Sequence, residues 1–178
     1  ANPHTSTIVG DPAPTFSEEE REHIDRKNKR KEIIKQSHRA FFDAVKKRMT
    51  PEIRDYIHNK RNITLEQLDS LELGFLSEAD WQEVKKEIIQ EVPSVLSIKD
   101  SNKLLINTYY ALCNRIIHPH YWCDDILYFT GEATPETEEG SGKYMKLNAS
   151  FSVSGNAEGY LLDSLNTKDK NIIFFAEG

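Results

Sequence analysis

The sequence predicts an α+β fold, in which an N-terminal helical region packs on a small, mainly antiparallel sheet formed by the second half of the chain. Up to about residue 95, helix-capping motifs precede segments whose apolar residues recur at helical spacing. From about Leu104 onward, Tyr, Ile, Phe, Val and Trp become frequent in short runs that are typical of strands. The change of pattern near residue 104 therefore divides a helical part from a mixed part.

Helix-start signals define the helical part. Ser17 followed by Glu20 forms a capping box before a long charged segment, and Thr64 followed by Gln67 forms a second one. Pro51 suits the first position of another helix. The predicted helices span 17–49, 50–58, 64–71 and 77–92. We expect the charged first half of the long helix to project into solvent, and the chain to break at Gly74.

Four runs in the second half predict strands, over 115–121, 126–130, 143–148 and 171–176. Asp124 and Asp125 predict a hairpin turn between the first two. The last run is apolar throughout, which is typical of a strand buried on both faces in a parallel sheet. Glu177 follows it, and an acidic residue at the carboxyl end of such a strand suits metal binding. An ordinary polar turn after the strand is the alternative.

Composition limits the class of protein. The 178 residues suffice for one domain with a flexible arm, and the Pro- and Thr-rich stretch 1–16 predicts that arm as a linker or disordered segment. We find no apolar run of the roughly 20 residues that a membrane helix needs, and no signal-peptide pattern. Two cysteines form no disulfide framework. We therefore expect a cytoplasmic protein with no membrane partner.

The charge is unevenly distributed along the chain. The net charge is −6, but residues 21–61 hold 14 Lys and Arg against 6 Asp and Glu, while the remainder holds 9 against 23. The dense run Arg26–Lys31 lies in the basic part. Such a segment indicates either nucleic-acid binding or a solvated helix face.

One group of four residues is a candidate zinc site. Cys113, His118, His120 and Cys123 follow the pattern C-x4-H-x-H-x2-C, and both residue types bind zinc. On a strand, the two histidines would point to the same face. The spacing matches no common zinc signature, so ordinary packing is the preferred interpretation.

Common catalytic motifs are missing from the sequence: it has no phosphate-binding loop, no nucleophile elbow and no H-E-x-x-H pair. The segment Lys143–Lys146 combines cations with an aromatic ring, which suits a nucleic-acid strand because Lys contacts phosphate and Tyr stacks on a base. An exposed strand with ordinary Lys and Tyr residues is the alternative.

Several segments, taken in order, resemble the RNA polymerase core of bacterial-type DNA primases, which contain a toprim metal-binding fold. The matching segments are Ala40–Phe42 with Arg54–Thr64, Leu71–Leu76 with Trp81, Arg115–His120, Ile126–Glu132, Lys143–Asn148 and Phe175–Gly178. They cover roughly residues 38–178, and their order and spacing make the resemblance more specific than any single motif does.

The resemblance implies a nucleic-acid-binding surface for single-stranded DNA template and nucleoside triphosphates. Arg61 corresponds to a basic residue of the family's template-binding surface. Lys143 and Tyr144, or else Lys146, correspond to basic and aromatic residues that line the active-site cleft. The implied binding residues are Arg61, Arg115, Lys143, Tyr144, Lys146 and Asn148.

The resemblance also implies a metal-dependent reaction in the complete enzyme. Glu177 corresponds to the toprim carboxylate that serves Mg²⁺- or Mn²⁺-dependent phosphoryl transfer, and is the predicted catalytic and metal-binding residue. Further parts are implied outside the sequence shown: the remaining acidic residues of the metal site, a separate N-terminal zinc-binding domain and the contacts to a replicative helicase.

The sequence departs from the family pattern at two places that face nucleic acid. Glu132 stands where the family has Arg, which reverses the charge, and no clear basic counterpart occurs near residues 152–155. Asn62 replaces a family Gly, which is a mild change because Asn also adopts the left-handed conformation. The departures indicate a divergent member of the family.

We therefore expect a linker over 1–16, the basic subdomain of a primase core over 17–170 and the first strand of a truncated toprim fold over 171–178. Two alternatives stay open. The chain could be a toprim-associated module of a phage or plasmid helicase–primase or nuclease, or a non-catalytic nucleic-acid-binding module that kept the scaffold.

The missing part of the predicted metal site leads to a first prediction. We expect the isolated chain to synthesise no RNA primers, because Glu177 alone does not complete a two-metal or one-metal phosphoryl-transfer site. A primer-synthesis assay on single-stranded DNA with Mg²⁺ or Mn²⁺ checks this, and primers made by the isolated chain would contradict it.

Overall fold

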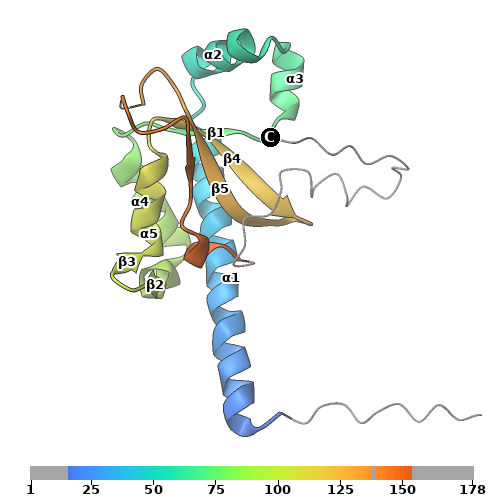
Figure 1. The fold of residues 1–178 in the computed structure, drawn as a ribbon, viewed down its shortest axis with the longest axis vertical. Helices are drawn as coiled ribbons and strands as arrows, with labels where there is room; N and C mark the ends of the chain where they lie inside the picture. Colours follow the sequence, from blue (N-terminus) through green and yellow to red (C-terminus); the bar gives the residue numbers. More distant parts are fainter. Residues whose placement is uncertain (1–15, 138, 154–178) are drawn as a thin grey trace, which may run out of the picture.

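A four-stranded antiparallel sheet lies across one long helix, with shorter helices on either side (Figure 1). The computed structural model describes residues 16–137 and 139–153. Within them the order of the strands in the sheet is β1-β4-β5-β6. A separate two-stranded ladder pairs β2 (Lys99–Asp100) with β3 (Lys103–Leu104). The predicted α+β class, with helices packed on a small antiparallel sheet, is confirmed.

Helix α1 (Glu18–Lys46) begins where the capping box predicts. The Ser17 hydroxyl accepts a hydrogen bond from the Glu20 N–H at 3.2 Å, and the Glu20 carboxylate accepts one from the Ser17 N–H at 2.8 Å. No residue of the helix before Ile34 is buried. The first half extends away from the rest of the described chain, as predicted (Figure 1).

Two short helices, α2 (Pro51–Arg61) and α3 (Leu65–Ser70), lie together at one end of the sheet (Figure 1). The Thr50 side chain caps α2, and Pro51 occupies its first turn, where no N–H donor is needed. Asn62 ends α2 in the left-handed conformation, with φ of 49°. This agrees with the prediction that Asn can replace the family's Gly there. The apolar residues that attach this pair to the sheet are Ile53, Ile57, Leu68, Leu73, Phe75 and Ile116.

The segment between α3 and the central hairpin is less regular than the sequence predicts. It contains strand β1 (Gly74–Leu76), helix α4 (Trp81–Glu91), helix α5 (Leu105–Thr108) and the 3-10 turns Pro93–Ser97 and Tyr109–Leu112. The expected break at Gly74 is wrong, because this residue begins a strand. Helix α4 begins later than predicted, at Trp81, and it follows a turn in which the Ser77 hydroxyl accepts a hydrogen bond from the Asp80 N–H at 3.1 Å.

The central hairpin joins β4 (Arg115–Trp122) to β5 (Asp125–Ala133). Its turn is formed by Cys123 and Asp124, one residue before the predicted position, and Cys123 has φ of 53°. Strand β6 (Tyr144–Lys146) pairs with the end of β5 and is shorter than predicted. The 3-10 turn Ala149–Phe151 follows. The predicted strand over 171–176 and the arm, apart from Phe16, lie outside the described residues.

A buried histidine lies in the core between α1 and the sheet. His38 Nε2 lies 3.0 Å from the Phe151 carbonyl and Nδ1 lies 2.7 Å from the Tyr109 hydroxyl. Since a carbonyl only accepts, Nε2 donates and Nδ1 accepts from Tyr109. Burial lowers the pKa of His38 to about 4, so the ring is neutral at pH 7. The ring of Phe41 stacks on Tyr109 with centroids 4.2 Å apart.

In the described part of the chain, no helix combines the length and the apolar character that crossing a bilayer requires.

The close approach of α1 and β1 leads to a stability prediction. A Cβ atom added at Gly74 would lie 2.5 Å from Val45 Cγ2, which is too close. We expect Gly74→Ala to lower the free energy of unfolding by about 1–3 kcal/mol through overpacking. Urea unfolding of Gly74→Ala, Val45→Ala and the double variant checks this, because removing the Val45 methyl groups should relieve most of the clash. Independent, additive effects would contradict the contact.

Candidate nucleic-acid interface

The sheet has one apolar and one polar face. The apolar face packs against α1 and includes Ile117 and Phe129. Backbone pairing aligns His118 with Thr130 and Thr130 with Lys146, and it aligns Ile116 with Glu132 and Glu132 with Tyr144. Residues paired in this way project from the same side of a sheet. The face opposite α1 therefore carries a concentration of polar and charged side chains, and these are His118, His120, Thr130, Glu132, Tyr144 and Lys146.

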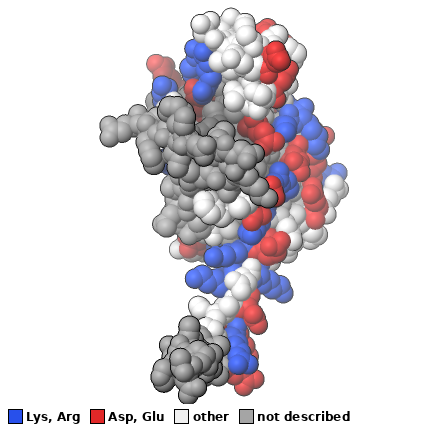
Figure 2. All heavy atoms as spheres, turned by 90° about the vertical axis from the view of Figure 1, so that its right-hand side faces the viewer, with Lys and Arg blue, Asp and Glu red and all other residues white. Residues whose placement is uncertain are grey.

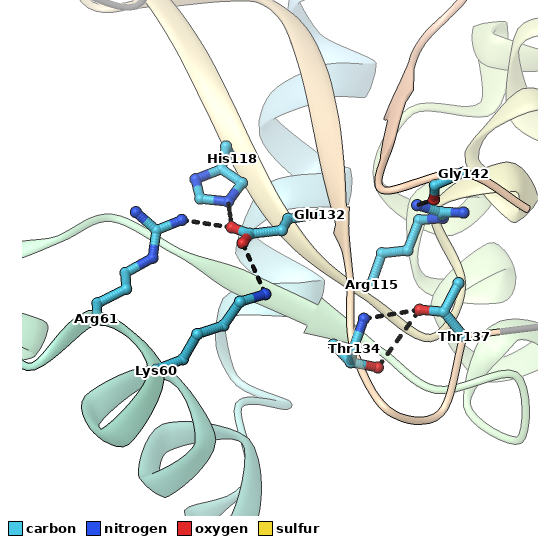
Figure 3. Close-up of polar contacts among 8 residues, drawn as sticks. All are labelled: Lys60, Arg61, Arg115, His118, Glu132, Thr134, Thr137 and Gly142. Atoms are coloured by element: carbon cyan, nitrogen blue, oxygen red, sulfur yellow. Dashed lines mark hydrogen bonds and ion pairs between the residues drawn. The ribbon is translucent and has the colours of Figure 1, made fainter. Parts of the chain in front are cut away.

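Glu132 is the centre of a charge cluster at one end of this polar face (Figure 3). Its side chain is 3 % exposed. Lys60 Nζ lies 3.1 Å from one carboxylate oxygen, and the other oxygen accepts a hydrogen bond from Arg61. His118 Nε2 lies 3.2 Å from that second oxygen. We call Lys60, Arg61, His118 and Glu132 the Glu132 cluster.

Three elements build the Glu132 cluster. The last turn of α2 supplies Lys60 and Arg61, and the left-handed residue Asn62 ends the helix directly after them. Strands β4 and β5 supply His118 and Glu132. Because the two cations come from a helix and the carboxylate from a strand, the cluster joins the α2–α3 pair to the sheet with charge as well as with apolar contacts.

The surroundings determine the protonation of the Glu132 cluster. Burial alone would raise the pKa of Glu132, but the hydrogen bonds and charges of Lys60 and Arg61 outweigh it and lower that pKa. Burial is the main cause that lowers the pKa of His118. At pH 7, Glu132 is therefore ionised and His118 neutral, and the cluster carries a net charge of one positive unit.

The predicted binding residues Arg61 and Tyr144 meet at one pocket. A hollow of about 310 Å³ is lined by Arg61, Leu71, Leu73, His118, Thr130 and Tyr144. The Arg61 side chain is 39 % exposed and Tyr144 is 59 % exposed. Lys143 Nζ lies 5.2 Å from the centre of the Tyr144 ring. The pocket thus combines a guanidinium, an exposed aromatic ring and a nearby ammonium group.

Lys146 and Asn148 lie at a different hollow. Together with Asn107, Met145 and neighbouring residues, they line a pocket of about 460 Å³. The Asn148 side chain also accepts the Ser150 N–H at 3.1 Å and so caps the turn at Ala149–Phe151. The residues predicted to form one binding surface therefore occur in more than one place.

Arg115 has a structural setting. Its side chain is buried, and Nη1 donates to the Gly142 carbonyl at 3.1 Å (Figure 3). Nη2 donates to the Ser141 carbonyl at 3.0 Å and to the Ser141 hydroxyl at 2.9 Å. These bonds hold the turn that leads into β6, and the burial of the Arg115 side chain makes it a poor contact for a phosphate in solution. Gly142 takes φ of 79° in this turn, a conformation that favours Gly.

The four residues considered as zinc ligands do not lie together in the structure. Among residues 16–137 and 139–153, no group of three or more His, Cys, Asp or Glu side chains could hold a metal ion. His118 and His120 do point to the same face of β4, as predicted, but His118 contacts Glu132 and His120 Nε2 lies 2.8 Å from the Thr130 hydroxyl. Cys123 is in the hairpin turn and Cys113 precedes β4. Glu177, the predicted metal ligand, lies outside the described residues.

Sequence reasoning missed Lys60 and the role of Glu132. Glu132 stood out only as a charge reversal relative to the primase pattern. A further signal was present, because an acidic residue inside an otherwise apolar strand needs a partner when buried. No local pattern, however, indicated that helix α2 reaches β5.

Comparison with known proteins gives no assignment: no protein-family model, no curated protein and no solved structure matches the chain.

The Glu132 cluster leads to a prediction about stability and pH. We expect Glu132→Gln to lower the free energy of unfolding at pH 7 by about 1–3 kcal/mol, because two cations lose a buried carboxylate. The folded-state pKa of Glu132 is lowered, so its contribution is present above the ordinary value of 4.5 and is lost as pH falls below it. The difference between the wild type and the variant should therefore shrink in acid.

Urea unfolding at pH 7 and in acid measures both effects. Glu87→Gln is the matched control, because the Glu87 side chain is 34 % exposed, much more than that of Glu132, and its partner Arg48 also contacts Glu83. We expect a loss of less than about 1 kcal/mol for that control. Equal losses of stability for the two variants, or a loss for Glu132→Gln that does not depend on pH, would show that Lys60 and Arg61 do not stabilise the ionised Glu132 carboxylate as described.

Proposed function

We propose that this chain is the template-binding part of a primase-like polymerase, which makes short RNA primers on single-stranded DNA from nucleoside triphosphates. Support comes from the ordered resemblance over roughly residues 38–178 and from an α+β architecture compatible with it. The described residues would contribute a binding surface rather than the reaction centre. We assign no catalytic step to them.

The observation that carries the proposal is the meeting of Arg61 and Tyr144 at one pocket. They are far apart in the sequence, and the primase resemblance implies contact with nucleic acid for both. A guanidinium binds phosphate through several hydrogen bonds. An exposed aromatic ring stacks on a base of any identity. Side by side, they suit the backbone and the base of one nucleotide in a single strand.

Glu132 is compatible with this function despite its charge. As a surface residue it would repel phosphate, but its side chain is buried and bonded to Lys60 and Arg61. Since the cluster has a net positive charge and Arg61 is partly exposed, phosphate meets a cation at this position. Glu132, in place of the Arg of the primase pattern, therefore mainly changes the contact between α2 and the sheet. The exposed charge at this position stays positive.

The complete enzyme would use Mg²⁺ or Mn²⁺ at a site that includes Glu177. The described residues gather no metal-binding group of three. A separate zinc-binding domain and a helicase partner would belong to the same proposal, as would a cytoplasmic location. The non-catalytic binding module and the helicase–primase or nuclease module share the proposed surface, so they predict the same DNA binding and differ in whether primers are made.

Binding of single-stranded DNA tests the proposal. We expect Tyr144→Ala to weaken binding of a fluorescent oligodeoxynucleotide roughly 5- to 150-fold, because base stacking on an aromatic ring contributes about 1–3 kcal/mol. Tyr144→Phe keeps the ring and should bind within about twofold of the wild type. Fluorescence anisotropy measures the dissociation constants.

Tyr110→Ala is the matched control, because Tyr110 is also exposed, at 45 %, but lies next to Trp81 and does not line the pocket of Arg61 and Tyr144. It should leave the dissociation constant unchanged. The proposal fails if the wild type does not bind at about 50 mM salt, where phosphate contacts are strong, or if the two alanine variants bind alike.

A further inference from the structure

The buried face of α1 continues as a basic face beyond the edge of the body. Arg26, Arg30, Ile34 and His38 follow one another at intervals of four residues. Such residues lie in one row along a helix, because four residues make slightly more than one turn. Ile34 and His38 are buried against the sheet side of the structure. Arg30 and Arg26 lie one and two turns further out, rotated by about 40° and 80° from Ile34 at 100° per residue, so both face the same half of the helix surface as Ile34.

Lys27 and Lys31 widen this row. Each lies one position after an arginine of the row, so the four side chains span about 140° of the helix surface at 100° per residue. Residues 16–29 and Lys31 are exposed. We call Arg26, Lys27, Arg30 and Lys31 the inner basic face.

The inner basic face is tied to the body at its near end. The Arg30 guanidinium carbon lies 5.9 Å from the centre of the Phe151 ring, and Phe151 is fully buried in the core beside His38. The cations thus begin directly where the packed core ends. Figure 2 shows Lys and Arg side chains gathered where α1 leaves the body. Among the described residues, the projecting helix and the adjoining end of the body form an angle with these cations on its inner side.

Two neighbouring acidic residues lie on another side of the same helical segment. At 100° per residue, Asp25 and Glu32 are each about 100° or more away from all four cations of the inner basic face, and Lys29 lies on their side. Glu22 precedes Arg26 by four residues and therefore lies next to it, at the outer end of the face. Between residues 25 and 32, the inner side thus carries four cations and no carboxylate.

We propose that the inner basic face binds the phosphate backbone of a nucleic-acid strand within this angle. The class of partner rests on the proposed function, and the site is a new one, separate from the pocket of Arg61 and Tyr144. Four closely spaced cations on a rigid helix suit a polyanion. An anionic membrane fits less well, because a helix that lies on a membrane needs an apolar side, and residues 25–32 include no apolar residue.

Replacing the four cations by glutamine tests the proposal. The variant Arg26→Gln, Lys27→Gln, Arg30→Gln, Lys31→Gln keeps helix propensity and removes only charge. We expect it to bind a single-stranded oligodeoxynucleotide at least tenfold more weakly at about 50 mM salt. The slope of log affinity against log salt should fall by about 1.5–3, since each lost phosphate contact removes about 0.7.

A matched control removes the same number of charges elsewhere. The variant Lys46→Gln, Lys47→Gln, Lys85→Gln, Lys86→Gln changes the net charge equally, but these lysines lie at the end of α1 or on α4. It should retain the wild-type salt slope. Circular dichroism and thermal unfolding verify that each variant folds. If the fourfold variant does not fold, Lys27→Gln with Lys31→Gln, at two exposed positions, gives the same test with about half the loss of slope.

The outcomes separate this proposal from that of the pocket. Tyr144→Ala should lower affinity and leave the salt slope unchanged, whereas the fourfold variant should change both. A loss with the fourfold variant alone would support the inner basic face and overturn the pocket. Equal salt slopes for the fourfold variant and its control would overturn the inner basic face. So would co-sedimentation with phosphatidylserine vesicles in the absence of any DNA binding, which would assign this face to membranes.

Discussion

Packing on one side of α1 organises the described structure. The stretch from Ile34 to Val45 contacts β1, β5, α4 and the turn that follows α4. Aromatic rings dominate this contact, since Phe41 lies against both Tyr109 and Phe129. Each of these elements is too short to be stable alone, and each buries its apolar side on the same helix. The positions of the polar sheet face and of the projecting half of α1 both follow from this one surface.

Charge is handled differently at the two ends of the molecule. At the end with α2 and α3, the Glu132 carboxylate is buried, and the side chains of Lys60 and Arg61 balance its negative charge. Such a pair contributes little to stability relative to an apolar contact of the same shape, but removing one member is costly. On the projecting half of α1, Arg26, Lys27 and Lys31 are exposed, and they lie on a different side of the helix from Asp25 and Glu32. The buried charges position a helix, and the exposed charges are available to a ligand.

Short sequence motifs correctly predicted those structural features that depend on interactions between residues close together in the sequence. The capping boxes at Ser17 and Thr64 marked helix starts correctly, because the hydrogen bonds involved span three residues. Runs rich in β-branched and aromatic residues predicted β4 and β5, and the strand period of two predicted the side shared by His118 and His120. Strand β1 was missed, because Gly74 is explained by its close approach to Val45 on another element. Nothing near Glu132 in the sequence identifies Lys60 and Arg61 as partners more than 70 residues away.

The same limit applies to the candidate site. Residue type and the primase resemblance selected Arg61 and Tyr144, which the fold brings together, but also Arg115, whose donors bind the turn at Ser141 and Gly142. An arginine that binds carbonyls and one that binds phosphate look alike in a sequence. Burial distinguishes them, and burial is a property of the assembled fold.

The uninterrupted course of α1 places a constraint on how this chain can vary. Residues 18–46 contain neither Gly nor Pro, so no hinge separates the projecting half from the packed half. Inserting or deleting a single residue between Lys31 and Ile34 would rotate the whole outer segment by about 100° relative to the sheet. The cations would then leave the inner side of the angle, although every one of them would still be present. Length changes in this stretch are therefore compatible with the same orientation only when they approximate whole helical turns, such as seven or eleven residues.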